Sequence, residues 1–272
     1  MARLEQQRDA WDEFAASYDD AVTPTATTAA EAALSLAGVR EGDRLLDVAA
    51  GPGALSVPAA RLGAHVLAVD FSPHMVHLLN ERARQEGLVH LEARVMDGTA
   101  LDFDPGTFDV ACSQLGIMLF PQRAEGLREL ARVTRPGGTG VMSVFGPPDR
   151  VPGLAMFFQA AAKSLPGFSA PPPRESPLFC LSDPQDLITE MTDAGFIAVH
   201  VEQIETVMHV ESGDELWTRM LGAAPAVAGL FRDATEAGRD AIRREVDVSF
   251  RSRFGDGPAD VPFVFNVGIG SR

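Results

Sequence analysis

The chain has 272 residues and a formal net charge of −15, from 38 acidic and 23 basic side chains. This length suits one large α/β domain with added segments, and the negative charge would repel a nucleic-acid backbone. Two cysteines are too few for a disulfide framework and favour a reducing compartment. Because the N-terminus lacks the apolar core of a signal peptide and no run of about 18 apolar residues occurs, we expect a cytoplasmic protein without a membrane span.

The first 40 residues, 1–40, read as a helical lid segment. Residues 4–20 have the spacing of a short amphipathic helix, and Ala29–Ala37 predicts a second one that ends at a glycine. The polar segment Thr23–Thr28 is expected to separate these two helices.

From residue 44 onward strands and helices alternate. Strands are predicted at 44–48, 65–69, 89–95, 108–113 and 140–144, and helices at 54–62, 73–86 and 123–134. Such alternation implies right-handed crossovers and a doubly wound, Rossmann-like, mostly parallel sheet, which makes 41–146 the core domain.

The pattern breaks after the fifth strand. Residues 147–182 are rich in Pro and Phe and read as a cap insertion with a helix near 154–164. The C-terminal part, 183–272, resumes the core and contains a second helical insertion, 211–256, before a last strand. The further predicted elements are helices at 183–194, 214–221 and 235–252 and strands at 196–210 and 261–270.

The stretch LLDVAAGPGAL, residues 45–55, predicts a strand, a tight turn and a helix N-terminus. A turn with Gly51 and Gly53 lets backbone N–H groups approach a ligand closely. Asp70 ends the second predicted strand and can accept hydrogen bonds from both hydroxyls of a ribose. Dehydrogenases and methyltransferases share these features, so the ligand class needs further signals.

Three residues favour S-adenosylmethionine over a dinucleotide. Ser56 stands where the third glycine of the dinucleotide fingerprint would lie. Asp47, at the end of the first strand, would disfavour a pyrophosphate and suits an ammonium group. Asp97, after the third strand, can accept a hydrogen bond from an adenine amino group. An acidic site of this kind fits a cationic nucleoside with an amino-acid tail.

The core resembles the class I S-adenosylmethionine-dependent methyltransferases of the ubiquinone-biosynthesis-like type (methyltransferase type 11). The matching stretches are LLDVAAGPG, AVDFSPHMV, ARVMDGTALDF, and FDVACSQLGIMLF followed by LRELARVTRPGG. The tail segments GDELWTRML and VPFVFNVGIGSR are also similar to this type. The resemblance implies a seven-stranded sheet with an antiparallel last strand, and it says little about the acceptor.

The resemblance also implies a set of cofactor-binding residues. They are Asp47, Ala49, Gly51, Gly53, Asp70, Phe71, Met75, Asp97, Gly98 and Gln114. The glycines should approach the methionine part near Asp47, Asp70 should hold the ribose, and Asp97 should meet the adenine with support from Gly98. Phe71 and Met75 flank the adenine or simply pack in a helix. The alanines in AAGPG are expected to leave the turn geometry unaffected.

Methyl transfer needs a positioned nucleophile and an excluded solvent, and it needs a general base only if the acceptor must lose a proton. Tyr18 and His209 are the candidate bases, although ordinary surface packing explains either residue as well. No His/Cys/Asp cluster has metal-ligand spacing.

The expected acceptor is a small, partly apolar molecule, and S-adenosylhomocysteine is the expected second product. The candidate acceptor pocket is Leu115, Met118, Phe120, Phe157 and Phe179. The inserted segments should form a lid, and their apolar residues would equally suit a homodimer interface. Two other functions stay open: a cyclase-like protein that keeps the cofactor without methyl transfer, and, disfavoured by the acidic site, a nicotinamide oxidoreductase.

Overall fold

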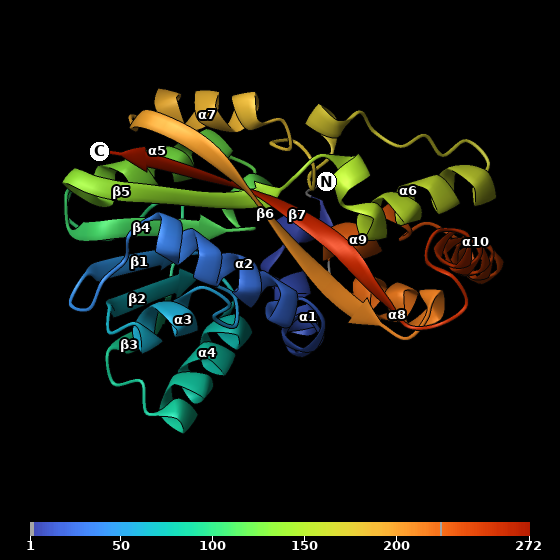
Figure 1. The fold of residues 1–272 in the computed structure, drawn as a ribbon, viewed down its shortest axis with the longest axis horizontal. Coiled ribbons are helices and arrows are strands. Elements are labelled where there is room, and N and C mark those ends of the chain that lie inside the picture. The colour runs from blue at the N-terminus through green and yellow to red at the C-terminus, as the bar shows by residue number, and fades with distance from the viewer. Residues whose placement is uncertain (1–2, 224) are drawn as a thin grey trace.

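The computed structural model describes residues 3–223 and 225–272, and its centre is one seven-stranded sheet with helices on both faces (Figure 1). The strands are β1 (Arg44–Val48), β2 (His65–Asp70), β3 (Leu91–Val95), β4 (Phe108–Gln114), β5 (Thr134–Phe145), β6 (Ile197–Val210) and β7 (Ala259–Ser271). Their order is β3-β2-β1-β4-β5-β7-β6. β7 pairs antiparallel with both of its neighbours, β5 and β6, and all other strand pairs are parallel. The predicted doubly wound sheet with an antiparallel last strand is therefore confirmed.

The helices divide between the two faces of the sheet and a cap. Their bounds are α1 (Arg8–Ala21), α2 (Thr23–Leu36), α3 (Ser56–Arg61), α4 (Pro73–Glu86), α5 (Arg123–Val133), α6 (Pro152–Ser164), α7 (Pro184–Asp193), α8 (Gly213–Ala223), α9 (Pro225–Leu230) and α10 (Glu236–Phe254). A short 3-10 turn, η1 (Leu4–Gln6), precedes α1. Helices α2, α3 and α4 pack on one face of the sheet, and α5 and α7 pack on the other.

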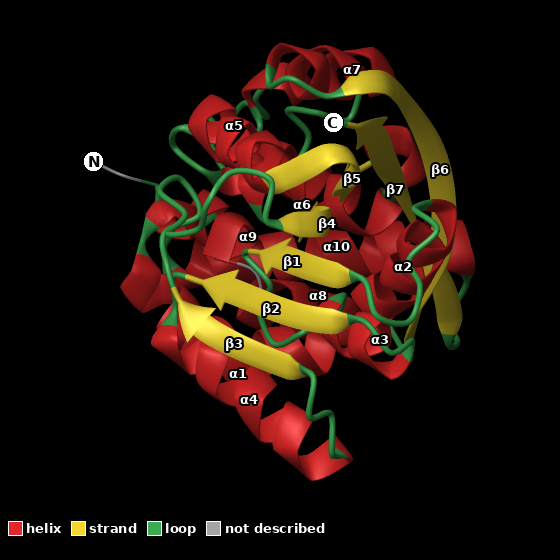
Figure 2. Ribbon diagram, turned by 90° about the vertical axis from the view of Figure 1, so that its left-hand side faces the viewer, coloured by secondary structure: helices red, strands yellow, loops and turns green. Residues whose placement is uncertain are grey.

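The strand order fixes where a ligand can bind. The chain leaves β3 at one edge and re-enters the sheet as β4, on the other side of β1. The switch point therefore lies between the carboxyl ends of β1 and β4, where open α/β sheets bind their ligands. Figure 2 shows the arrowheads of β1, β2 and β3 pointing to this same edge. Leu45 and Leu46 are both fully buried, because β1 is covered on both faces.

Two predicted features of the secondary structure are wrong, and one helix was missed. The segment Thr23–Thr28 does not separate two helices but begins α2, where Pro24 occupies the first turn and costs no hydrogen bond. Helix α5 ends before Pro136, as predicted, but β5 already starts at Thr134. Helix α9 was not predicted, because its six residues are too few to show a periodicity.

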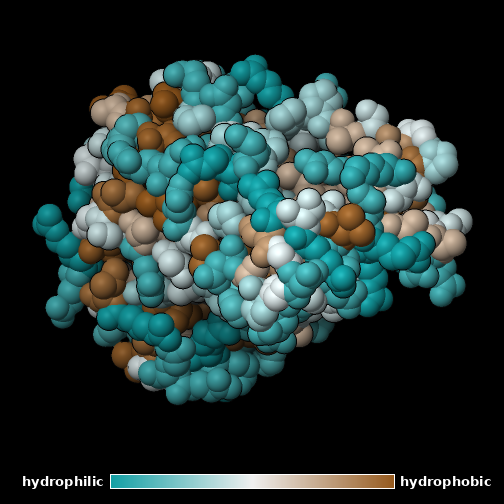
Figure 3. All heavy atoms as spheres, turned by 45° about the vertical axis from the view of Figure 1, so that its right-hand side comes forward, coloured by the Kyte–Doolittle hydropathy of each residue, from teal (hydrophilic) through white to brown (hydrophobic). Residues whose placement is uncertain are grey.

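The segments predicted as insertions form a cap around the C-terminal end of β6 and the N-terminal end of β7 (Figure 1). Helix α6 contacts α10, and α8 contacts both α10 and the N-terminal helix α1. Phe157 of α6 stacks on Trp217 of α8 with ring centroids 5.4 Å apart, so an aromatic core joins the two insertions. The surface in Figure 3 is predominantly hydrophilic, with hydrophobic side chains in scattered groups.

Candidate active site

The loop after β1 forms the predicted glycine turn. Gly51 and Gly53 have φ angles of +54° and +100°, which glycine adopts without strain. Ala49 also has a positive φ, +57°, so an alanine here adopts a backbone conformation that disfavours a side chain. That the alanines leave the turn geometry unaffected stays a prediction, and Ala49 adopts its positive φ within a turn that forms as expected. A Cβ on Gly53 would lie 2.3 Å from Leu79 of α4, so this glycine allows helix packing and does not line the ligand cavity.

Asp70, at the end of β2, holds the glycine turn. Its Oδ2 accepts a hydrogen bond from the Gly51 N–H at 2.9 Å, and its Oδ1 accepts one from the Ser72 N–H at 2.9 Å. The side chain is buried, and burial raises its pKa to about 6. A carboxylate has more lone pairs than these two contacts use, so it can still accept ribose hydroxyls.

Asp47, at the end of β1, is also buried. Its Oδ2 accepts a hydrogen bond from the Ser56 hydroxyl at 2.6 Å. Its Oδ1 is buried and has no hydrogen-bond partner among the described residues. Burial raises its pKa to about 7, with a contribution from the charge of Asp70. Ser56, which stands in place of the third glycine, therefore orients the Asp47 carboxylate. A dinucleotide would bring its negatively charged pyrophosphate close to this carboxylate, which is unfavourable.

Gln114, at the end of β4, provides a second buried acceptor at the switch point. Its Nε2 donates to the Ala26 carbonyl of α2 at 2.7 Å. Its Oε1 is buried and finds no partner in the part of the chain that the structure describes. Because orphaned buried acceptors are costly, Asp47 and Gln114 together indicate a ligand that brings donors to this point.

The carboxyl end of β3 forms the opposite side of the cavity. Asp97 is exposed, and its Oδ1 accepts hydrogen bonds from the N–H and hydroxyl of Thr99 at 2.8 Å and 2.7 Å. A Cβ on Gly98 would come within 2.7 Å of the Phe120 ring, so only glycine fits there. Phe71 and Met75 line the cavity next to these residues.

The N-terminal helix α1 covers the site and is held on the core by its acidic residues. Asp12 accepts a hydrogen bond from the Ser72 hydroxyl at 2.6 Å, and Asp19 pairs with Arg82 at 2.6 Å. Arg82 also donates to the Pro52 carbonyl of the glycine turn at 2.9 Å. The helix therefore contacts the same loop that approaches the ligand.

Tyr18 lies on the inner face of α1. Its ring meets Trp11 edge-on, with centroids 5.5 Å apart. Burial, followed by the charge of Asp70, raises the pKa of the phenol. Tyr18 therefore keeps its proton at neutral pH, which does not favour the predicted role as a general base.

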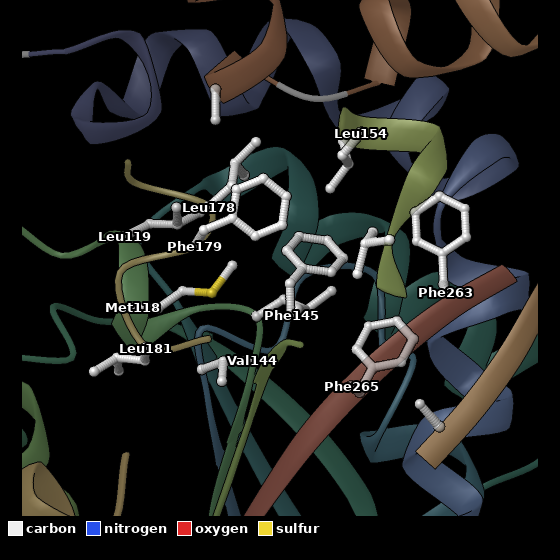
Figure 4. Close-up of a cluster of buried hydrophobic side chains, with 14 of the residues drawn as sticks. Met118, Leu119, Val144, Phe145, Leu154, Leu178, Phe179, Leu181, Phe263 and Phe265 are labelled. Carbon is white, nitrogen blue, oxygen red and sulfur yellow. The ribbon is translucent and has the colours of Figure 1, made fainter. Parts of the chain in front are cut away.

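Two adjoining cavities lie beneath α1. The larger has a volume of about 590 Å³ and is lined by the strand ends, the glycine turn and residues of η1 and α1. The smaller, about 50 Å³, is called the apolar chamber here. Its wall is Trp11, Tyr18, Val22, Thr25, Ala26, Leu115, Met118, Leu119, Phe145, Leu154, Leu178, Met208, Met220, Ala226, Val227, Phe263 and Phe265. Figure 4 shows part of this wall, with Phe145, Phe263 and Phe265 together.

Most predicted cofactor residues line the larger cavity. They are Asp47, Ala49, Gly51, Asp70, Phe71, Met75, Asp97, Gly98 and Gln114. Of the predicted acceptor residues, Leu115 lines both cavities, Phe120 lines the larger one and Met118 lines the chamber. The walls shared by the two cavities are formed by Trp11, Tyr18, Ala26, Leu115 and Leu119.

Three predicted residues lie elsewhere. Phe157 is fully buried in the cap and Phe179 packs on other aromatic rings, so neither lines a cavity. His209 is exposed at the end of β6, where its Nδ1 lies 3.0 Å from Asp260 Oδ1, outside both cavities. Its predicted catalytic role is therefore withdrawn.

Several wall residues were not predicted. Glu5, Gln6 and Arg8 from the N-terminal turn line the larger cavity, and Met208 and Met220 line the chamber. They converge from distant segments of the chain, and although Met220 lies in the stretch GDELWTRML, nothing in the sequence indicates that these side chains face one cavity.

The fold, with its cavity at the switch point, is a Rossmann-like α/β fold of the methyltransferase type, and comparison with known proteins agrees. The family described as "Methyltransferase domain" matches residues 45–138. A demethylmenaquinone methyltransferase of Clavibacter sepedonicus is 36% identical over 169 residues, which are 57% of this chain and 65% of that protein. An uncharacterized Mycobacterium tuberculosis protein is 46% identical over 105 residues, and the match spans only 38% of its length and 39% of this chain.

Solved structures show the same fold. The [4+2]-cyclase SpnF superposes with a TM-score of 0.60 at 15% identity, covering 99% of this chain and 97% of that one. The YcgJ protein of Bacillus subtilis gives 0.57 at 15% identity, covering 90% and 98%. These findings support the predicted class I S-adenosylmethionine-dependent methyltransferase assignment for the matched part of the chain, residues 45–138, with S-adenosylmethionine as the cofactor. In the described residues no helix has the length and apolar character to cross a bilayer.

Proposed function

We propose that this protein transfers a methyl group from S-adenosylmethionine to a small, partly apolar molecule. The observation that carries the proposal is the pair of orphaned buried acceptors, Asp47 Oδ1 and Gln114 Oε1, at the switch point of the sheet. A ligand ammonium would satisfy both, and a cavity of about 590 Å³ is within the ordinary size of ligand sites.

The residues present fit each part of this cofactor. Asp47 and Gln114 would accept hydrogen bonds from the ammonium of the methionine part. Tyr18 lies beside the glycine turn, since a Cβ on Gly51 would be 3.9 Å from its ring, and its hydroxyl would donate to the carboxylate of the methionine part. Asp70 would accept the ribose hydroxyls, and Asp97 would accept the adenine amino group.

When bound, the cofactor supplies an electrophilic methyl carbon on a sulfonium. The protein's own work is to hold the two reactants together and to exclude water. We place the acceptor at the border between the two cavities, because residues of both walls meet there next to the site proposed for the cofactor. Trp11, Tyr18 and Leu115 form this border and keep water from the acceptor.

Calorimetry and an acceptor screen test this proposal. S-adenosylmethionine and S-adenosylhomocysteine should bind, and NAD and NADP should not. In the screen, mass spectrometry should count one methyl gained by the acceptor for each S-adenosylhomocysteine released. A molecule consumed without methyl gain, with the cofactor intact, would instead support the cyclase-like function. Binding of NAD and not of the sulfonium would refute the proposal.

A further inference from the structure

Helix α4 supports the glycine turn along one of its faces. Four residues share this face because they follow each other at intervals of three or four positions: Ser72, Met75, Leu79 and Arg82. Met75 lines the larger cavity, and Leu79 lies where a Cβ on Gly53 would be only 2.3 Å away. This face of α4 therefore packs against the loop that approaches the ligand, and Arg82 belongs to it.

The Arg82 guanidinium joins three segments that are far apart in the chain. Its Nη1 donates a hydrogen bond to the Pro52 carbonyl of the glycine turn at 2.9 Å. Its Nη2 donates one to Asp19 Oδ2 of α1 at 2.6 Å. Pro52 lines the larger cavity, whereas Arg82 and Asp19 are not among the residues of its described wall. Arg82 would therefore act on a ligand through its two partners.

The docked position of α1 depends on the charge of Arg82. The Asp19 side chain is 16% exposed, and its Oδ1 is buried without a hydrogen-bond partner among the described residues. A carboxylate that is largely removed from water is costly unless a countercharge compensates it. Without the guanidinium, α1 could keep Asp19 in this position only at a cost in free energy, so the loss of Arg82 should loosen α1.

We propose that Arg82 is a positioning residue, which couples the docking of α1 to the shape of the glycine turn and thereby sets the affinity for the amino-acid part of the cofactor. The inference rests on the proposed placement of the cofactor, with its methionine part beside this turn. The hydrogen bond to the Pro52 carbonyl holds the turn in one orientation, and the bond to Asp19 holds α1 over it. Because both contacts share one planar group, each of them favours the other.

A separate contact holds α1 at the ribose end of the site. Asp12 Oδ1 accepts a hydrogen bond from the Ser72 hydroxyl at 2.6 Å, and the Ser72 N–H donates to Asp70 Oδ1 at 2.9 Å. Arg82 takes no part in these contacts. Loss of Arg82 should therefore disturb binding of the amino-acid end of the cofactor and leave binding of the adenosine end largely intact. A general destabilisation of the fold would instead weaken binding of both ends.

The geometry requires an arginine and not only a positive charge. The guanidinium carries its two terminal nitrogens in one rigid plane, so it reaches Pro52 and Asp19 at the same time. A lysine ammonium is a single point charge on a flexible stem. Arg82→Lys would keep a positive charge near Asp19 and lose the fixed bridge to the turn, so this variant separates the bridge from the charge.

Calorimetry with two ligands tests the inference on the intact protein. The ligands are S-adenosylhomocysteine and 5′-methylthioadenosine, which lacks the amino-acid part. Arg82→Gln and Arg82→Lys should each weaken binding of S-adenosylhomocysteine at least about tenfold and binding of 5′-methylthioadenosine less than about threefold. Retained binding of 5′-methylthioadenosine shows that the variants are folded. Arg84→Gln is the matched control on the same helix and should change neither affinity, because the Arg84 side chain is 68% exposed and pairs with Glu81.

A double-mutant cycle tests the coupling itself. Asp19→Ala should weaken S-adenosylhomocysteine binding about fivefold, and Asp20→Ala, a change at its exposed neighbour, should have no effect. Because Arg82 and Asp19 act through one bridge, the double variant of Arg82→Gln and Asp19→Ala should lose no more affinity than Arg82→Gln alone. Independent sites would lose roughly fiftyfold together.

Three results would each overturn the inference: additive losses in the cycle, unchanged S-adenosylhomocysteine affinity in Arg82→Gln, or an equal loss of affinity for both ligands. Failure of the wild-type protein to bind either ligand would instead refute the proposed placement of the cofactor, and this inference with it. Binding by the wild-type protein that Arg82→Gln leaves unchanged would overturn this inference alone.

Discussion

Replacing Asp47 by asparagine should stabilise the fold and weaken cofactor binding. Burial raises the pKa of Asp47 to about 7, from an ordinary value of 3.8. The folded protein thus holds this proton more tightly than the unfolded chain does, so the free energy of unfolding falls as the pH rises from about 4 to about 7. Asparagine keeps the shape of the protonated acid and still accepts the Ser56 hydrogen bond, and it carries no charge to desolvate.

The size of the effect follows from the pKa difference. About three pH units at 1.36 kcal/mol each set a ceiling near 4 kcal/mol, so we expect Asp47→Asn to gain about 2–4 kcal/mol above pH 7. The gain should vanish near pH 4, where both states hold the proton. Cofactor affinity should fall by about tenfold or more, because an interaction with a charged partner is lost.

Urea unfolding at about pH 4 and about pH 8 measures the stability change. Asp256→Asn is the matched control, because the Asp256 side chain is 90% exposed and should give no comparable gain. Equal or lower stability of Asp47→Asn at the higher pH, or a gain that persists at the lower pH, would refute the reasoning about this buried charge.

Other changes test neighbouring parts of the account. Cofactor affinity should decline as the pH falls through about 7 and then about 6, because Asp47 and Asp70 must ionise to bind; a flat profile in calorimetry would contradict this. Asp70→Ala should lower cofactor affinity about tenfold or more, through loss of hydrogen bonds worth roughly 1.5–3 kcal/mol; unchanged affinity would exclude the ribose role. Ala49→Gly should raise the free energy of unfolding by about 0.5–1 kcal/mol by relieving the positive φ, and a loss of stability would show that the turn is not strained. Hydrogen exchange in residues 10–28 and 147–180 should slow on adding S-adenosylhomocysteine, independently of protein concentration, if these segments are a lid; protection that follows concentration would indicate a subunit interface.

The sequence predicted the sheet and the cofactor side of the site well, for a physical reason. Parallel strands buried on both faces read as short apolar runs, and their carboxyl ends meet at one edge. A residue placed just after such a strand, such as Asp70 or Gln114, is therefore near the ligand whatever the rest of the fold does. Glycines with positive φ and helix caps such as Asp183, whose carboxylate accepts the Gln185 N–H at 2.9 Å, are equally local signals.

The acceptor side could not be predicted in the same way. Its walls come from α1, α2, α6, α8, α9, β6 and β7, and their relative placement depends on tertiary packing. Phe157 and Phe179 have the composition of pocket residues, yet they fill the aromatic core of the cap. The burial of individual side chains could not be predicted either, because nothing local in the sequence distinguishes the buried Asp70 from the exposed Asp97.

The most direct test of the central claim compares S-adenosylhomocysteine with 5′-methylthioadenosine, which lacks the amino-acid part. If Asp47 and Gln114 accept the cofactor's ammonium, calorimetry should show at least about tenfold tighter binding of S-adenosylhomocysteine, since about 1.4 kcal/mol corresponds to that ratio. The preference should largely disappear in Asp47→Asn. Equal affinity for the two compounds in the wild-type protein would contradict the account.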